Sequence, residues 1–430
     1  MQLFDAAVAA SSPGTATARA IDEIVIDRAC RVWIYAFGKA ALPMASAAVT
    51  SLARSMHSVV GGIVVSPEGG PAPYPTLVSM RGDHPIPAGH SFAAAAKIAE
   101  VAAGRRGSDV AIVLLSGGAS SLIAAPLRGM NEADLVTLYE LMLGSGLDIA
   151  ATNIVRKRFT RWSAGRLALA LAPAATHCLA VSDVADDDLA MIGSGPCVPD
   201  TATVKDVTAI LTRAGLMGRI PETHRAYLTG VERGTIPETP TAAHPAFAHV
   251  SARVIGNNAL AVIGAANAAR EAGEPTRVVP QRLEGEAARA GESIARQLLE
   301  LRADPSGDRC IIWGGETTVT LRSSGARASG GGRCQELALA AARVLHQAGD
   351  SADGISILAA GTDGRDGATD ACGAIVDRTT WSAIAADGRD PIHALQAHES
   401  NGALRLANAL IPRRTTGTNV NDVVVGLIAR

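Results

Sequence analysis

The chain has 430 residues, enough for two or three domains with sizeable cores. Its hydrophobic content of 48 % and charged content of 19 % are typical of a folded globular protein and argue against a disordered one. A formal net charge of −2 and an aromatic content of 3 % argue against nucleic-acid binding through a basic face or base stacking, and against attachment to a membrane surface.

Strand-like and helix-like segments alternate over the first part of the chain. The apolar run 31–38 ends in glycine before an alanine-rich helical segment, and residues 61–66 are predicted to form a second strand. The loop 82–91 precedes another helix, and residues 109–121 indicate a strand, a glycine turn and the start of a helix. Residues 177–188 repeat this pattern with acids in the turn. The alternation predicts an α/β fold with a Rossmann-like, doubly wound parallel sheet that binds ligands at the carboxyl ends of its strands.

A second domain is expected after residues 236–249, a stretch rich in proline, threonine and histidine that is the predicted linker. Further strand-like runs follow it, and GGETTVTLR (314–322) is typical of a hairpin within a mixed sheet. The expected domains are residues 1–240, with the parallel sheet, and residues 250–430, a second α/β domain with a mixed sheet. The active site is expected in the cleft between the two domains.

Glycine-rich turns follow most of the predicted strands. They include GKA at 38–40, SGGASS at 116–121, GNN at 256–258, GGETT at 314–318 and GGGR at 330–333. Glycine lets backbone N–H groups approach an anion closely, and a following helix N-terminus adds about half a positive charge. Each turn alone is also what a tight strand–helix connection needs, but together they predict a large polyanionic ligand. The phosphate-binding candidates are Ser116, Gly117, Gly118, Asn257, Gly315, Glu316 and Thr317.

Two common nucleotide-binding motifs are absent from the sequence. The GKA turn has no upstream glycine in the Walker A position, and Ala40 stands where a serine or threonine would meet magnesium. No G-x-G-x-x-G motif follows the first predicted strand, so a nicotinamide site of the usual Rossmann type is poorly supported. A nucleotide triphosphate would have to be held in another way.

An acidic turn follows the strand-like run at 177–182. Four aspartates lie within residues 183–188, and magnesium prefers oxygen ligands, usually one or two carboxylates with phosphate oxygens and water. The turn is therefore a candidate magnesium site with Asp187 and Asp188 as ligands, and a solvated acidic loop that caps a helix is the alternative. Asp363 lies in a second acidic turn, which could bind metal or substrate or only shape Asp-Gly turns.

Positive charge is carried mainly by arginine, because only four of the 39 cationic residues are lysines. Lys39 and Lys157 lie inside motifs, where a compact point charge is more readily needed. Arg156 and Lys157 belong to the basic stretch 153–166, whose alternative interpretation is a solvated helix face. Arg333 is embedded in glycines and has no helix face to solvate, so we expect it to contact a phosphate or carboxylate.

An ordered set of motifs resembles that of the class II glycerate 2-kinases over residues of about 31 to 425. The set comprises GKA, LLSGGASSL, N-x-V-R-K, SDVADDDLAMIGSGP, VIGNN, GGETTVT, GGR-x-QE, GTDGRDGATDACGAIVD and TGTNVND. The resemblance implies a Rossmann-like domain joined to a MOFRL domain, and ATP-dependent phosphorylation of D-glycerate at its 2-hydroxyl with Mg²⁺. It also places the lysine of GKA and the arginine of GGR-x-QE in the active site, and these match Lys39 and Arg333.

Phosphoryl transfer requires that charge on the moving group be neutralised and that the acceptor hydroxyl be held in line. Lys39 and Arg333 are the expected catalytic cations, Asp183 is expected to orient the hydroxyl, and the backbone of residues 116–118 is expected to cradle phosphates. The substrate-binding candidates are Arg156, Lys157 and Asp363.

The sequence departs from the family pattern at several positions. Arg158 and Ser163 replace a histidine and a lysine, Cys334 replaces the asparagine of GGRNQE, Cys197 replaces the threonine of GSGPT, and RRTTGTNV stands for TGPTGTNV. These departures leave open a kinase for another small hydroxy acid, or a protein that binds a hydroxy acid without turnover. A hydroxypyruvate reductase is a further alternative, which the missing dinucleotide motif does not favour.

The remaining expectations concern partners and compartment. The expected ligands are ATP, Mg²⁺ and a small hydroxy acid, with no nucleic-acid or membrane partner, and a homodimer stays open. No apolar run approaches the roughly 20 residues of a membrane helix, and the N-terminus lacks the basic start of a signal peptide. Six cysteines are scattered without paired or metal-like spacing. The sequence therefore predicts a reduced, cytoplasmic protein.

Overall fold

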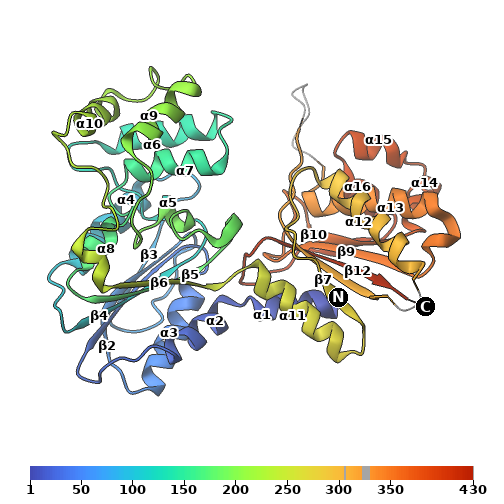
Figure 1. The fold of residues 1–430 in the computed structure, drawn as a ribbon, viewed down its shortest axis with the longest axis horizontal. Helices are drawn as coiled ribbons and strands as arrows, with labels where there is room; N and C mark the ends of the chain where they lie inside the picture. The colour runs from blue at the N-terminus through green and yellow to red at the C-terminus, as the bar shows by residue number, and fades with distance from the viewer. Residues whose placement is uncertain (305–306, 322–329, 430) are drawn as a thin grey trace. The chain divides into compact units, whose positions relative to one another are not determined.

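The computed structural model describes residues 1–304, 307–321 and 330–429, and the chain forms two compact units. One unit consists of residues 13–255, and the other combines residues 1–12 with residues 256–430. Figure 1 shows that each unit is built on its own sheet. Among the described residues, no helix is both long and apolar enough to cross a membrane.

The sheet of the first unit has six strands in the order β3-β2-β1-β4-β5-β6. The pairs β3–β2, β2–β1, β1–β4 and β4–β5 are all parallel, as the alternating sequence pattern predicts. All seven side chains of β4 are buried, as expected for a central strand covered on both faces. The strands are β1 (Arg31–Phe37), β2 (Val59–Ser66), β3 (Leu77–Arg81), β4 (Asp109–Leu115), β5 (Ala175–Val181) and β6 (Val250–Gly256).

Helices cover both faces of this sheet, and a further helical layer stands apart from it (Figure 1). The face that carries Tyr35 and Phe37 packs against α4 and α8, while α3 packs against β1, β2 and β4. Helices α6, α7, α9 and α10 share a separate apolar core. The helices are α2 (Pro13–Asp22), α3 (Ala41–Arg54), α4 (Gly89–Ala102), α5 (Ala119–Leu122), α6 (Glu132–Leu143), α7 (Ile149–Arg158), α8 (Arg166–Leu171), α9 (Val204–Arg213) and α10 (Glu222–Glu232).

The second unit contains a mixed sheet, which confirms the prediction of a second α/β domain. Its order is β11-β10-β9-β12-β8-β7; β7 and β8 are parallel, and the other neighbours are antiparallel. The strands are β7 (Thr276–Val278), β8 (Cys310–Gly315), β9 (Ile355–Gly361), β10 (Ala371–Asp377), β11 (Leu410–Pro412) and β12 (Asp422–Ile428).

Two layers of helices enclose the mixed sheet. The alanine-rich helix α13 is buried along most of its length between α12 and the sheet, and Gly291 of α12 lets the two helices approach, because a Cβ there would lie 2.0 Å from the carbonyl oxygen of Leu337. Helices α1 and α11 pack together and contact β12. The helices are α1 (Gln2–Ala10), α11 (Asn258–Glu271), α12 (Ala287–Arg302), α13 (Arg333–Ala348), α14 (Thr380–Ala386), α15 (Pro391–Gln396) and α16 (Ser400–Leu406).

The division of the chain differs from the expected domains of residues 1–240 and 250–430. Strand β6, which follows the expected linker, joins the edge of the first sheet beside β5. Helix α1 belongs to the second unit because it packs on α11, where Gly264 leaves room for the side chain of Ala10. No local pattern in the sequence indicates that residues 1–12 pack with the second unit.

The prediction of a hairpin at residues 314–322 is wrong for residues 314–321, which the structure describes. Strand β8 ends at Gly315, and Thr318 forms only an isolated parallel bridge with Glu286. The segment after Gly315 is tied to residues 283–286 instead of folding back on β8. Arg322, the last residue of the expected hairpin, lies outside the described residues.

Candidate active site

The glycine turns after β1 and β4 are hydrogen-bonded to each other. The amide of Lys39 donates to the carbonyl of Gly117 at 2.9 Å, and the amide of Ala40 donates to the hydroxyl of Ser116 at 3.0 Å. Gly38 has φ +121°, and a Cβ on it would lie 2.2 Å from the Ser116 hydroxyl oxygen. Because β1 and β4 are adjacent and parallel, their turns meet at one edge of the sheet and present Lys39 to solvent.

Of the three phosphate-cradle candidates in this turn, Ser116 is engaged in the fold. Its amide donates to the carbonyl of Phe37 at 3.0 Å and its hydroxyl serves the first turn, so neither group faces a ligand. The amides of Gly117 and Gly118, in contrast, donate no hydrogen bond to any described residue. These two amides are the part of the cradle that is available to an anion.

Side chains from three other strand ends converge on the two glycines. A Cβ on Gly118, whose φ is +88°, would lie 3.1 Å from Cδ2 of His84 and 3.6 Å from Cγ of Lys39. A Cβ on Gly117 would lie 2.3 Å from Oδ2 of Asp183. Lys39 follows β1, His84 follows β3, the glycines follow β4 and Asp183 follows β5. The carboxyl edge of the parallel sheet therefore gathers a lysine, an imidazole and a carboxylate around a turn without side chains.

Arg156 adds a buried positive charge to this edge. Its guanidinium stacks on the ring of Tyr139 at 4.6 Å, and the residue is 8 % exposed. Its Nε and Nη2 atoms are buried without a hydrogen-bond partner among the described residues. A buried, unpaired guanidinium is costly, so a bound anion would stabilise it strongly.

The pKa of His84 indicates that Lys39 and Arg156 both lie close enough to act on its ring. Partial burial lowers the pKa of His84, and the positive charges of Lys39 and Arg156 lower it further. Both cations therefore act on the imidazole that lies over Gly118. Lys39, Arg156 and the Gly117 and Gly118 amides together are a candidate anion-binding site, which we call the β-edge site.

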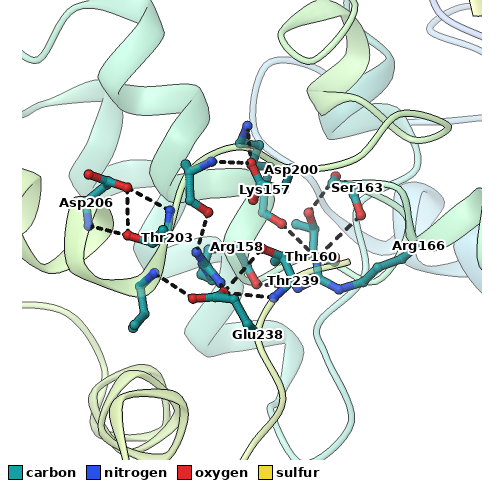
Figure 2. A network of polar contacts seen from close by, with 12 residues as sticks. Lys157, Arg158, Thr160, Ser163, Arg166, Asp200, Thr203, Asp206, Glu238 and Thr239 are labelled. Atoms are coloured by element: carbon teal, nitrogen blue, oxygen red, sulfur yellow. Dashed lines mark hydrogen bonds and ion pairs between the residues drawn. The ribbon is translucent and has the colours of Figure 1, made fainter. Parts of the chain in front are cut away.

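Lys157, the neighbour of Arg156, lies in a different environment. Its ammonium forms a 2.6 Å ion pair with Asp200, and both side chains are almost fully buried. Figure 2 shows this pair beside Arg158, whose guanidinium pairs with Glu238 and donates to the carbonyl of Ala202 at 2.9 Å. Lys157 is thus a structural cation that ties α7 to the segment after β5, and we do not retain it as a substrate ligand.

The same network accounts for two departures from the family pattern. Arg158 is fully buried, and Ser163 accepts a 2.6 Å hydrogen bond from the Thr160 hydroxyl (Figure 2). Arg166 donates to the backbone carbonyls of residues 157, 158, 160 and 163 and so holds the same loop. These substitutions belong to a polar framework under the helical layer and not to the β-edge site.

Two cysteine departures are interior as well. Cys197 is 1 % exposed beside Cys178, which raises the pKa of Cys197 together with burial. Cys334 is 2 % exposed within the core around α13, and burial raises its pKa. The RRTTGTNV departure contains Arg414, which pairs with Asp5 at 2.5 Å and stacks on Phe4, so it anchors α1 within the second unit.

The acidic turn after β5 combines capping with an unusual backbone. Asp188 accepts a 2.9 Å hydrogen bond from the amide of Ala190, while Asp186 and Asp187 have φ of 59° and 54°. Within the described residues, no three His, Cys, Asp or Glu side chains are arranged to hold a metal ion. The donor set fits only the mode in which Mg²⁺ takes one or two carboxylates and draws its other ligands from phosphate and water. Asp187 and Asp188 stay predicted ligands of that kind.

In the second unit, Arg333 is paired with carboxylates. Its Nε and Nη2 lie 2.6 and 2.8 Å from the two oxygens of Asp422, and its Nη1 lies 3.1 Å from Oε1 of Glu316. Glu316 also accepts a 2.5 Å hydrogen bond from Asn421. The carboxylate of Glu316 is thus engaged with Arg333, and its expected contact with phosphate stays a prediction. An anion could reach Arg333 only by replacing Glu316, the more exposed of the two acids.

The remaining predicted residues of this unit have structural partners. Gly315 packs against Leu283, since a Cβ there would lie 2.3 Å from the Leu283 carbonyl oxygen. Asn257 caps α11 by accepting from the amide of Leu260 at 3.0 Å, and Asp363 closes a turn by accepting from the amide of Arg365. Thr317 is buried. These contacts explain the motifs locally and leave their predicted ligand contacts as predictions.

His84 is the residue that the sequence analysis missed. The loop 82–91 was expected only to precede a helix, because the short strand β3 before it was not predicted. With β3 placed beside β2, the loop becomes a strand-end turn like those after β1 and β4. A histidine three residues after the short run at 77–81 was the available signal.

Comparison with known proteins agrees with this architecture. A domain of unknown function (DUF4147) matches residues 1–229, and the MOFRL family matches residues 309–422. The chain is 34 % identical to D-glycerate 2-kinase of Thermotoga maritima, over 100 % of this chain and 97 % of that protein. It is 32 % identical to glycerate 2-kinase of Pyrococcus horikoshii, over 100 % and 96 %. The crystal structure of glycerate kinase from Thermotoga maritima matches with a TM-score of 0.86 at 33 % identity, over 100 % and 98 % of the two chains.

Proposed function

The chain belongs to the glycerate 2-kinase family, and we propose that it transfers the γ-phosphoryl group of ATP to the 2-hydroxyl of D-glycerate. The products are 2-phosphoglycerate and ADP. The observation that carries the proposal, beside the family, is the β-edge site, where Lys39 and the buried guanidinium of Arg156 act on the same point above Gly118. Both substrates are anions, and this site supplies positive charge and backbone amides for them.

Each group of the β-edge site has a distinct task in this reaction. Lys39 is exposed and carries its charge on a long side chain, so it follows the transferring phosphoryl group and neutralises charge on its oxygens. Arg156 is fixed by its stacking on Tyr139 and binds the glycerate carboxylate, for which its planar donors are suited. The amides of Gly117 and Gly118 donate to phosphate oxygens, and Asp183 orients the acceptor from beside Gly117.

Mg²⁺ would bind Asp187 or Asp188 and offset charge on the nucleotide phosphates. Arg333 is proposed as a phosphate ligand in the same reaction. Its orientation is fixed by Asp422, and exchange of Glu316 for a phosphate would preserve the charge balance of the guanidinium. This role assigns Asp422 to holding Arg333 and not to chemistry.

D-Glycerate is favoured over another hydroxy acid because of where the sequence departures lie. Arg158, Ser163, Cys197 and Cys334 are all buried, and each has an interior partner or core environment. None of them contributes a side chain to the β-edge site. The substitutions that suggested an altered acceptor are therefore changes of packing.

The proposal is tested by ADP release coupled to NADH oxidation, with D-glycerate, L-glycerate and C4 hydroxy acids as acceptors. We expect turnover with D-glycerate, dependence on Mg²⁺, and a product whose ³¹P spectrum is that of 2-phosphoglycerate. NADH and NADPH oxidation with hydroxypyruvate, measured without coupling enzymes, examines the reductase alternative. Absence of ADP release on D-glycerate, or a product phosphorylated on the 3-hydroxyl, would contradict the proposal.

A further inference from the structure

His84 occupies the centre of the β-edge site without a structural task of its own. It follows β3 in the loop 82–91, and its Cδ2 and Nε2 atoms lie 3.1 and 3.4 Å from the position of a Cβ on Gly118. The imidazole makes no hydrogen bond to any described residue, and the side chain is only partly buried. By contrast, its neighbour Asp83 accepts bonds from the amide and ring of His90 and so fixes the loop on α4.

Gly118, which lies beneath the imidazole, has to be a glycine for two reasons. Gly118 has φ +88°, which a residue with a side chain adopts at a cost, and a Cβ there would crowd the His84 ring and touch the Lys39 side chain. The turn after β4 therefore keeps clear the space between the His84 ring, the Lys39 side chain and the amides of residues 117 and 118. The hydroxyl of a small acceptor molecule has to lie in such a space, next to the groups that bind the transferring phosphoryl group.

The charged groups around His84 come from three elements. Lys39 follows β1 and Arg156 lies in α7, and both act on the imidazole, while Asp183 follows β5 beside Gly117. The two cations and partial burial hold the pKa of His84 below its usual range, so the ring is neutral at pH 7 and can accept a proton. When the anionic substrates bind, their charges offset Lys39 and Arg156, and the ring becomes a better base at the moment of reaction.

We propose that His84 is a catalytic residue that accepts the proton of the acceptor hydroxyl. This inference rests on the proposed function. In the step, the acceptor oxygen bonds to the γ-phosphorus of ATP while its proton moves to a ring nitrogen of His84. The bond between the γ-phosphorus and the bridging oxygen breaks, and ADP leaves with that electron pair. The imidazolium then releases the proton to water, which restores the neutral ring.

His84 suits this task better than the other polar side chains of the site. Lys39 is an ammonium with no acceptor capacity, and Arg156 carries only donors. The carboxylate of Asp183 lies over Gly117, one residue from the space that His84 borders. Asp183 therefore orients the acceptor, and the ring over Gly118 takes the proton.

The test compares wild type with His84→Gln, His84→Ala and the control His393→Gln, which alters an exposed histidine on α15. We expect kcat with D-glycerate to fall about 10²-fold or more in both His84 variants. KM for D-glycerate should change far less, and added imidazole should restore part of the rate in His84→Ala. The acidic limb of the wild-type pH–kcat profile should disappear in His84→Gln, while His393→Gln keeps the wild-type rate and profile.

The outcomes separate the two proposals. If wild type is active and His84→Gln keeps kcat within about threefold with an unchanged pH profile, the role of His84 is overturned and the proposed function stands. If wild type releases no ADP with D-glycerate, the proposed function fails and the role of His84 fails with it. A loss of rate in His84→Ala that imidazole does not restore, together with a normal pH profile in His84→Gln, would mean a structural role and would also overturn the inference.

Discussion

Arg333 and Asp422 form a two-point ion pair, with the guanidinium Nε and Nη2 2.6 and 2.8 Å from the two carboxylate oxygens. Asp422 is 3 % exposed at the start of β12, and Arg333 is the first residue of α13. The pair therefore ties the central strand of the mixed sheet to the helix that fills its core. Arg333, expected from the sequence to contact a phosphate or a carboxylate, contacts two carboxylates of its own unit.

The pair makes a prediction about pH. Burial, Asp366 and Glu316 raise the pKa of Asp422 to about 6 from 3.8, although Arg333 opposes them. Because the folded state then binds more protons than the unfolded state between about pH 4 and 6, the contribution of Asp422 to the unfolding free energy falls as pH rises through this window. Urea unfolding of wild type and Asp422→Asn should show a difference in unfolding free energy that changes over pH 4–6 and is flat above it. A constant difference across the window would contradict the raised pKa.

Lys39→Ala should be folded but inactive. Lys39 is exposed, and its own side chain supports no other part of the unit, so its thermal unfolding midpoint should match that of wild type. Loss of one charge that stabilises the transferring phosphoryl group costs on the order of 10²–10³ in rate. Lys205→Ala, an exposed lysine on α9, is the control and should keep full activity in the ADP-release assay. Similar rates in the two variants would exclude Lys39 from the transfer.

The turns at the ends of β1, β4 and β5 could be predicted from sequence because they combine apolar runs, glycines and acids in a regular order. The ion-pair partners of the side chains could not be predicted in this way. Nothing in the run Arg156-Lys157-Arg158 tells that the first residue is unpaired while the other two pair with Asp200 and Glu238. These partners lie 43 and 80 residues away in the sequence, and their positions follow only from how α7 packs beneath the later loops.

The same limit explains His84 and helix α1. The strand β3 has only five residues, and just one of them is buried, so its pattern is too weak to mark the loop after it as a strand end. Helix α1 packs on α11, whose first residue lies about 250 residues further along the chain, through a close approach at Gly264. Local patterns specify elements well, and the long-range contacts that complete a site or exchange a terminal helix are not encoded in any one segment.

The neighbours Arg156 and Lys157 should respond in opposite ways to loss of charge. Arg156→Met removes a buried, unpaired guanidinium, so the unfolding free energy should change by no more than about 1 kcal/mol, the scale of its stacking on Tyr139. Its KM for D-glycerate should nevertheless rise steeply. Lys157→Met leaves Asp200 buried without its partner and should lower the unfolding free energy by about 3–5 kcal/mol. Urea unfolding and steady-state kinetics of both variants would decide this, and equal destabilisation would show that Arg156 is a structural residue too.

Gly118→Ala tests the open space of the β-edge site directly. The residue has φ +88°, and the added Cβ would lie 3.1 Å from His84 and 3.6 Å from Lys39, so either the ring or the turn has to move. The cost of the left-handed backbone alone is roughly 1–2 kcal/mol. Gly104→Ala carries the same cost, because Gly104 has φ +72° but open space around its Cβ position. We expect similar losses of stability in the two variants and a loss of kcat confined to Gly118→Ala. If Gly118→Ala turns over D-glycerate as fast as Gly104→Ala does, the space above this turn is not where the acceptor reacts.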